Sequence, residues 1–310
     1  MEGASPRLRA IRFPLPRRQD EEWKNRMAHL LWHERLTSLY LGHYFVTMDK
    51  LLGVLLENGT DTVVDIVNEE WDFIVVDDLF WSFGFALTTL KHRLWELNGM
   101  KGHRPHIIVY ATAASSLISA ESTRSVGRNW VSRAPFCPPY PTNEDDVYSP
   151  NKFTSRIIAF YETIFIPHQM VNMKKLGVND FTWTEFYSRT SLQFSDAFDS
   201  LGWPVAVGTD MKNVGAHCKS SKTLPKKFAE FVEAPESKGN LTGVSLREAL
   251  CTGVPLIVMP VYAEQAFSAN LMLALGHAPV INKFTLTEES VFETIDGVLS
   301  RPEKQQKSKN

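Results

Sequence analysis

The stretch GVSLREALCTGVPLIVMPVYAEQ, residues 243–265, carries the most information about the fold. Ser245 followed three residues later by Glu248 forms a capping box that starts a helix, and Gly253 ends it. The apolar run that follows predicts a buried strand ending at Pro260. In an open α/β sheet, the end of a strand and the start of a helix face one crevice, where ligands bind. Because a helix N-terminus attracts phosphate, this stretch predicts a phosphate-ligand site in an α/β fold.

Segments on both sides continue the alternation of strands and helices. Downstream, the pattern predicts a helix over residues 265–275, a short strand over 279–281 and a helix over 287–299. Upstream, the β-branched run FIVV at 73–76 predicts a strand buried on both faces of a parallel sheet. A helix at 81–97 and a strand at 107–110 follow it. This order is typical of an α/β fold with right-handed crossovers.

Further segments complete the N-terminal part. Helical spacing of apolar residues predicts a long helix or a bent pair over residues 21–56. A second helix is expected over 152–175, with a kink at Pro167. Short strands are expected at 191–194 and 205–207.

Changes in composition give the expected domain boundaries. Residues 1–20 are basic, carry three prolines and are typical of a tail. An N-terminal α/β domain is expected over 21–223, a polar linker over 224–240 and a C-terminal domain over 241–310. The proline-rich stretch 122–151 is expected to be a loop that lines a variable binding cleft.

The composition of the 310 residues, 44% hydrophobic and 22% charged, is typical of a globular protein. Lys and Arg number 33 against 35 Asp and Glu, and the net charge of -2 argues against a nucleic-acid partner. The three scattered cysteines, Cys137, Cys218 and Cys251, are expected to be free thiols. No stretch has the apolar length of a signal peptide or a membrane span, so the chain as written is expected to be soluble.

The stretch 243–265 resembles the C-terminal signature of UDP-glycosyltransferases of the animal glucuronosyltransferase type. Its pattern is approximately H-G-G-x-x-S-x-x-E-A, then G-x-P, then a strand ending in P-x-x-x-[DE]-Q. The matching residues are Ser245, Glu248, Ala249, Gly253, Pro255, Pro260, Glu264 and Gln265. The resemblance, from about residue 11 to 302, implies an α/β, GT-B-like fold of two facing Rossmann-like domains. The first would bind the acceptor and the second, cut short in this chain, would bind UDP-sugar.

The resemblance also assigns roles to single residues. It implies that Ser245 lies by the diphosphate, that Glu248 accepts hydrogen bonds from the ribose, and that Glu264 and Gln265 bind the sugar hydroxyls. Without it, the first two residues only cap a helix and the last two are solvated loop residues. UDP-sugar is then a co-substrate. Neither a cofactor nor a metal is implied, because helix dipoles and hydrogen bonds neutralise the diphosphate.

The stretch FIVVDDLF, residues 73–80, resembles the family's strand that ends in a catalytic aspartate, at the position of Asp77. In the family this carboxylate orients a histidine that takes the acceptor's hydroxyl proton. The alternative is a solvated strand end. No strand followed by a histidine precedes residue 21, so the partner base is missing. The histidines expected to be surface or packing residues instead are His29, His33, His43, His92, His103 and His106.

The chain departs from the family pattern in two further places. Asn240, Leu241 and Thr242 occupy the HGG positions, and the segment that opens the family's nucleotide domain is missing before them. A polar tail after residue 302 stands where the family continues to a membrane anchor.

The resemblance therefore predicts glucuronosyl or hexosyl transfer from UDP-sugar to small lipophilic acceptors, with weak or no activity in this chain. It also implies the endoplasmic reticulum membrane and homo- or hetero-oligomers with full-length relatives. Two alternatives stay open. One is a non-catalytic truncated isoform that acts as an interaction or acceptor-binding protein, and the other is an incomplete gene model.

Overall fold

The computed structural model describes residues 21–34, 41–78, 81–111, 159–195, 208–214, 240–241, 246–252, 255–261 and 265–300. The N-terminal elements are α1 (Glu21–His33), α2 (Leu41–Asn58), α3 (Thr60–Asn68), β1 (Phe73–Asp77), α4 (Trp81–Leu97), β2 (His106–Ala111), the π-helix η3 (Tyr161–Phe165), α7 (Ile166–Gln169), α8 (Val171–Lys175), α9 (Trp183–Arg189), β3 (Thr190–Ser195) and β4 (Met211–Asn213). The C-terminal elements are β5 (Asn240–Leu241), α11 (Leu246–Thr252), β6 (Leu256–Ile257), α12 (Gln265–Ala274), the 3-10 helix η4 (Lys283–Thr285) and α13 (Glu288–Leu299).

Within the described residues, the main sheet has four strands in the order β1-β2-β3-β4. Each neighbouring pair is parallel, and Phe73 pairs with His106 while Asp77 pairs with Tyr110. The register between β2 and β3 shifts at Ile107/Ile108. Because all four strands run the same way, their carboxyl ends meet at one edge of the sheet.

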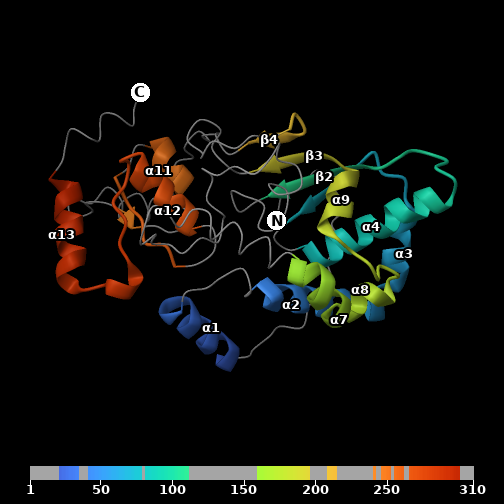
Figure 1. Ribbon diagram of the computed structural model, residues 1–310, viewed down its shortest axis with the longest axis horizontal. Helices are drawn as coiled ribbons and strands as arrows, with labels where there is room; N and C mark the ends of the chain where they lie inside the picture. Colours follow the sequence, from blue (N-terminus) through green and yellow to red (C-terminus); the bar gives the residue numbers. More distant parts are fainter. Residues whose placement is uncertain are drawn as a thin grey trace, which may run out of the picture.

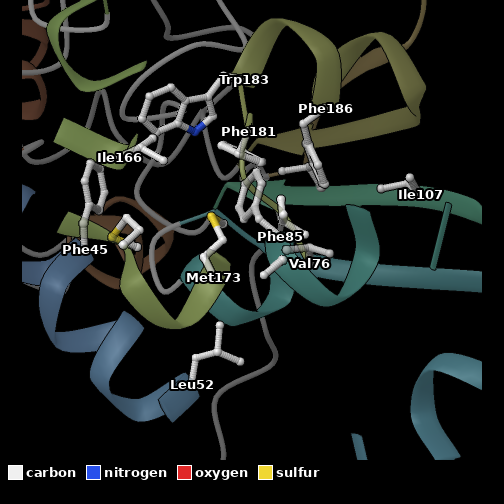
Figure 2. Packing of buried hydrophobic residues seen from close by; sticks show 14 of the residues in the cluster. Phe45, Leu52, Val76, Phe85, Ile107, Ile166, Met173, Phe181, Trp183 and Phe186 are labelled. Atoms are coloured by element: carbon white, nitrogen blue, oxygen red, sulfur yellow. The ribbon is translucent and has the colours of Figure 1, made fainter. Parts of the chain in front are cut away.

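Helices α2, α3, α4 and α8 lie on one side of this sheet (Figure 1). The core between them is strongly aromatic: the Phe85 and Phe186 rings are 4.3 Å apart, and Phe45 meets Tyr161 edge-on at 4.9 Å. Figure 2 shows side chains from α2, α4, α8, β1 and β2 converging on this core. Each such buried side chain contributes roughly 1.5–3 kcal/mol of transfer free energy, so this cluster holds the N-terminal part together.

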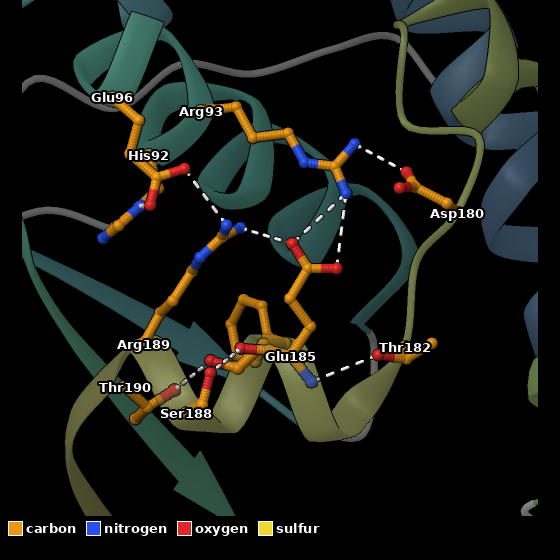
Figure 3. A network of polar contacts seen from close by, with 10 residues as sticks. His92, Arg93, Glu96, Asp180, Thr182, Glu185, Ser188, Arg189 and Thr190 are labelled. Carbon is orange, nitrogen blue, oxygen red and sulfur yellow. Dashed lines mark hydrogen bonds and ion pairs between the residues drawn. The ribbon is translucent and has the colours of Figure 1, made fainter. Parts of the chain in front are cut away.

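Ion pairs between charged side chains connect α9 to α4 (Figure 3). Arg93 on α4 contacts Asp180 at 2.8 Å and Glu185 at 3.4 Å. Arg189 contacts Glu185 at 2.6 Å and Glu96 at 3.1 Å. Arg93, Arg189 and Glu185 are partly buried and linked in a network, so they contribute more than an isolated surface pair does. Asp180 is 75% exposed and adds little.

A second, smaller sheet lies in the C-terminal part. Strand β5 pairs in parallel with β6, and Val258 forms a further parallel bridge to Val280. Helix α12 covers the sheet with Ala269 and Met272, both fully buried. Helix α13 begins with a capping box in which Thr287 and Ser290 bond each other's backbone N–H.

The expected α/β class is confirmed, because the described residues form two parallel sheets, each with its own helices and core. The GT-B-like arrangement of two facing domains stays a prediction. The segment 21–56 forms a pair of helices rather than one. The segment 152–175 breaks at Met170, not at Pro167. Pro167 is the second residue of α7 and directly follows the π-helix η3, so it lies inside a continuous helical run over 159–169.

Two expectations are wrong. Strand β1 is not buried on both faces, because within the described residues it is the end strand of the sheet and leaves Phe73 and Val75 more than 60% exposed. Cys251 is not a free thiol, because it is disulfide-bonded. The spacing of the cysteines along the sequence does not indicate a disulfide, because the pairing depends on how the chain folds. The tail 1–20, the loop 122–151 and the strand expected at 205–207 lie outside the described residues.

Candidate functional site

Two adjacent carboxyl groups stand at the carboxyl edge of the main sheet. Asp77 is the last residue of β1 and is half-buried, with Tyr110 opposite it on β2. Asp78 follows, and its backbone N–H continues the ladder by donating to the Tyr110 carbonyl at 3.2 Å. In a parallel sheet this edge is where ligands bind, so β1 delivers both carboxyl groups to the expected position.

Asp78 has the more unusual environment of the two. It is 7% exposed, and within the described part of the chain its Oδ1 atom has no hydrogen-bond partner. Burial, and secondarily the neighbouring charge of Asp77, raises the pKa of the Asp78 carboxyl well above its usual range. Perturbed carboxyl groups of this kind are concentrated at functional sites.

The second sheet positions a second group of polar side chains, at the end of β6. Val258 is fixed by two backbone bonds, donating to Pro279 at 3.0 Å and accepting from Ile281 at 2.9 Å. Three residues later, the N–H of Val261 donates to the Gln265 Oε1 atom at 2.9 Å. The carbonyl of the same residue accepts from Lys283 Nζ at 2.9 Å.

Gln265 therefore has two structural roles. It is the first residue of α12, and its side-chain carbonyl closes the turn that leaves β6. This turn connects the end of strand β6 to the start of helix α12. The crevice predicted between the strand end and the helix start at Ser245 stays a prediction, because Ser245 lies outside the described residues. The predicted contact of Gln265 with sugar hydroxyls stays a prediction, and so does the orienting role of Asp77.

The other predicted site residues are described only in part. Ser245 and Glu264 lie outside the described residues. Glu248 lies on α11, whose helix begins at Leu246 as the capping pattern predicted, and only its backbone is described.

The described histidines fit the expectation of surface or packing residues. His92 is the buried one: it lies on α4, is 2% exposed and has Nδ1 3.4 Å from Glu96. Burial lowers its pKa, against an opposing effect of the Glu96 carboxylate. The exposed ones are His29, His33, His43, His103, His106, His168 and His277.

Two residues with distinctive environments were missed from the sequence. The family pattern assigns a role to Asp77 and none to Asp78. Two consecutive acidic residues after a strand are nevertheless a signal of a functional site. Lys283 gave no signal, because its partners Leu31, Glu34 and Val261 come from distant parts of the chain.

Comparisons with known proteins find similarity over parts of the chain. The family model described as UDP-glucoronosyl and UDP-glucosyl transferase matches residues 240–308, which include both strands of the second sheet. A UDP-glucuronosyltransferase of Pleuronectes platessa is 28% identical over 112 residues, 34% of this chain but only 23% of that protein. The solved structure of the glycotransferase of kitacinnamycin has a TM-score of 0.43 at 13% identity, covering 84% of this chain and 77% of that one. That likeness is too distant to carry an argument.

Two parallel sheets, each with polar side chains where its strands end, define an α/β protein among the described residues. The family model makes residues 240–308 similar to UDP-glycosyltransferases, and the match to the fish enzyme agrees with it. The chain spans about a quarter of the length of that relative. No helix within the described residues has the length and apolar character needed to cross a membrane.

Proposed function

We propose that the protein binds UDP-sugar through its C-terminal part and transfers the glucuronosyl or hexosyl group to a small lipophilic acceptor. The observation that carries this proposal is the family match over residues 240–308, within which β6 and α12 join at the turn closed by Gln265. UDP-sugar is a co-substrate, and the proposal includes no metal and no cofactor.

In such a transfer, the acceptor oxygen bonds to the anomeric carbon while the bond from that carbon to the UDP oxygen breaks. The acceptor's proton passes to a base, and UDP leaves with the bonding electron pair. The proposal gives Asp77 the orienting role and Glu248 the ribose contact. Ser245 would face the diphosphate, where helix N–H groups offset the negative charge.

Binding measurements can test the donor site without requiring turnover. UDP and UDP-glucuronic acid would each be titrated into the purified chain by calorimetry. Glu248→Gln is expected to weaken both ligands about tenfold, the effect of a charge-assisted hydrogen bond. Gln265→Met is expected to weaken the UDP-sugar but not UDP, because only the sugar is in its reach. The matched control is Glu293→Gln, at an exposed position on α13.

Turnover would then be measured as UDP release with a phenolic acceptor, comparing UDP-glucuronic acid with UDP-glucose. A folded protein that binds neither UDP nor either UDP-sugar at millimolar concentration contradicts the proposal.

A second candidate function, acceptor or protein binding without catalysis, is favoured by one observation. Asn240 and Leu241 occupy positions of the family's HGG, and they form β5, hydrogen-bonded to β6. Glycines at such positions allow the backbone to approach a diphosphate closely, and neither of these two residues is a glycine. Acceptor binding without UDP binding would support this candidate. Association with full-length relatives and with the endoplasmic reticulum membrane belongs to the same proposal.

The domain boundaries at residues 21–223, 224–240 and 241–310 stay predictions. Strand β5 begins at Asn240, the last residue of the expected linker.

A further inference from the structure

The outer edge of β1 carries backbone groups that no described strand pairs with. The carbonyl of Asp72 accepts from His106, and the N–H of Asp78 donates to Tyr110, so even-numbered residues turn toward β2. Backbone groups alternate along a strand, and those of Phe73 and Val75 therefore point outward. Within the described residues, nothing pairs with these two N–H and two C=O groups.

The side chains along this edge are apolar as well. Phe73 is 61% exposed and Val75 is 63% exposed. Natural sheets protect an end strand with charges, prolines or a covering segment, because an open apolar edge pairs readily with another chain. None of the four residues of β1 before Asp77 carries a charge or is a proline.

A pocket opens beside this edge, between β1, α3 and α4. Its volume is ≈ 240 Å³, larger than the roughly 150 Å³ cavity that takes up benzene in a well-studied protein. Its walls are mainly apolar and include Ile66 on α3, Ile74 on β1 and Leu87 on α4. The Trp71 indole, whose Nε1 donates to Ile66 O at 2.8 Å, forms part of the wall.

Among the described residues that line this pocket, Lys91 is the one that carries a charge. Its ammonium group donates to the Glu69 carbonyl at 2.7 Å, at the C-terminal end of α3. An ammonium group has three donors, so this contact holds the charge at the pocket while other donors stay available. The pocket therefore favours a ligand with an apolar group and a negative charge.

We propose that the open edge of β1 binds an extended apolar peptide segment of a partner protein as an added strand, with an acidic group at Lys91. The outward N–H and C=O groups of Phe73 and Val75 would hydrogen-bond the peptide backbone. One apolar side chain of the peptide would fill the pocket. Strand addition of this kind takes its affinity from main-chain bonds and its specificity from pockets for alternate side chains.

The experiment uses a fluorescent pentapeptide of alternating valine and threonine that carries one glutamate, titrated into the full chain by anisotropy. Val75→Pro removes an outward N–H without breaking a bond to β2, which an end strand tolerates. This variant is expected to weaken binding about two- to tenfold, the effect of one lost hydrogen bond. Val75→Thr, which keeps the N–H, is the control and is expected to bind as the wild type does.

Lys91→Gln tests the charge. It is expected to weaken the glutamate peptide about two- to fivefold and to leave a glutamine version of the peptide unaffected. If Val75→Pro does not fold, a peptide N-methylated at its inner amides, titrated into the wild type, removes the same backbone bonds and is expected to bind more weakly.

Three results would overturn the proposal. The first is a wild-type protein that does not bind the peptide. The second is peptide binding that is unchanged by both Val75→Pro and N-methylation. The third is a protein that binds decanoate at Lys91 but no peptide, since the pocket would then be a site for small carboxylates.

Discussion

Asp77 and Asp78 are adjacent in the chain, but their surroundings differ strongly. The family pattern singles out Asp77, which is half-buried at the end of β1. Asp78 is the residue that the fold buries with an unpartnered Oδ1 atom among the described residues. A buried group of this kind costs stability, and proteins retain such costs mainly where function requires them.

The first prediction concerns the effect of Asp78 on stability as the pH changes. Because the pKa of this carboxyl is raised in the folded protein, the folded state holds the proton more tightly than the unfolded chain. Its stability contribution is therefore complete below the unfolded pKa of about 3.9 and is lost as the pH rises toward the folded pKa. Asp78→Asn is neutral at every pH and is expected to escape this loss.

Urea unfolding at several pH values would measure the difference. At pH 7 Asp78→Asn is expected to be more stable than the wild type by roughly 1–3 kcal/mol, and near pH 4 the two should coincide. Asp77→Asn, at the half-buried neighbour, is the control and should show a smaller effect. A gain that persists unchanged at pH 4 would contradict the assignment to proton binding.

At the scale of elements, sequence patterns gave the type of most helices and strands correctly. The helix expected at 287–299 is α13, and the strand expected at 191–194 is β3. The helix begins at a capping residue, and the strand alternates polar with apolar side chains. Neither local signal depends on distant partners. Local periodicity was therefore sufficient for them.

Predictions of features that depend on contacts with distant segments of the chain were less accurate. The FIVV run has the composition of a central strand, but whether a second strand covers its edge is decided by sheet order, which composition does not encode. The break in the segment 152–175 is similar. The presence of Pro167 predicts a kink at that residue, whereas the helix is interrupted at Met170. The residues that follow Met170 are hydrogen-bonded to a side chain of another helix.

That other helix is α2, whose Asp49 supplies the N-terminal cap of α8. The Asp49 carboxylate accepts from the backbone N–H of Asn172 and of Met173, each at 2.9 Å. It also accepts from the Asn172 side chain at 3.2 Å. A negative charge at a helix N-terminus satisfies free donors and complements the helix dipole. Asp49 is 3% exposed, so water does not replace it.

The second prediction is that Asp49→Ala destabilises the protein by roughly 2–3 kcal/mol. The substitution leaves two backbone donors of α8 unpaired in a buried place and removes charge-assisted bonds. Asp49→Asn keeps one acceptor oxygen and is expected to cost about half as much. Chemical unfolding of the three proteins gives the measurement. Equal stability of the alanine variant and the wild type would show that the cap contributes nothing.

On the scale of the whole molecule, Lys283 joins segments from opposite ends of the chain. Its Nζ atom donates to Leu31 and Glu34, at the end of α1, and to Val261, after β6. Lysine donors suit the carbonyl groups left unpaired at a helix C-terminus. Burial lowers the pKa of this ammonium, with Glu34 acting in the opposite direction. The contact ties α1 to the turn beside Gln265 in the candidate donor site.

The third prediction is that Lys283→Met detaches α1 from the C-terminal part. Methionine keeps the apolar stem but donates no hydrogen bond, so the carbonyls at the end of α1 lose their shared partner. Amide hydrogen exchange is expected to speed up about tenfold in α1 and at Val261, while amides of α2 and α4 keep their wild-type rates. Lys50→Met, at an exposed position on α2, is the control. Uniform acceleration across all helices would indicate a global loss of stability, and unchanged exchange in α1 would show that other contacts hold this helix.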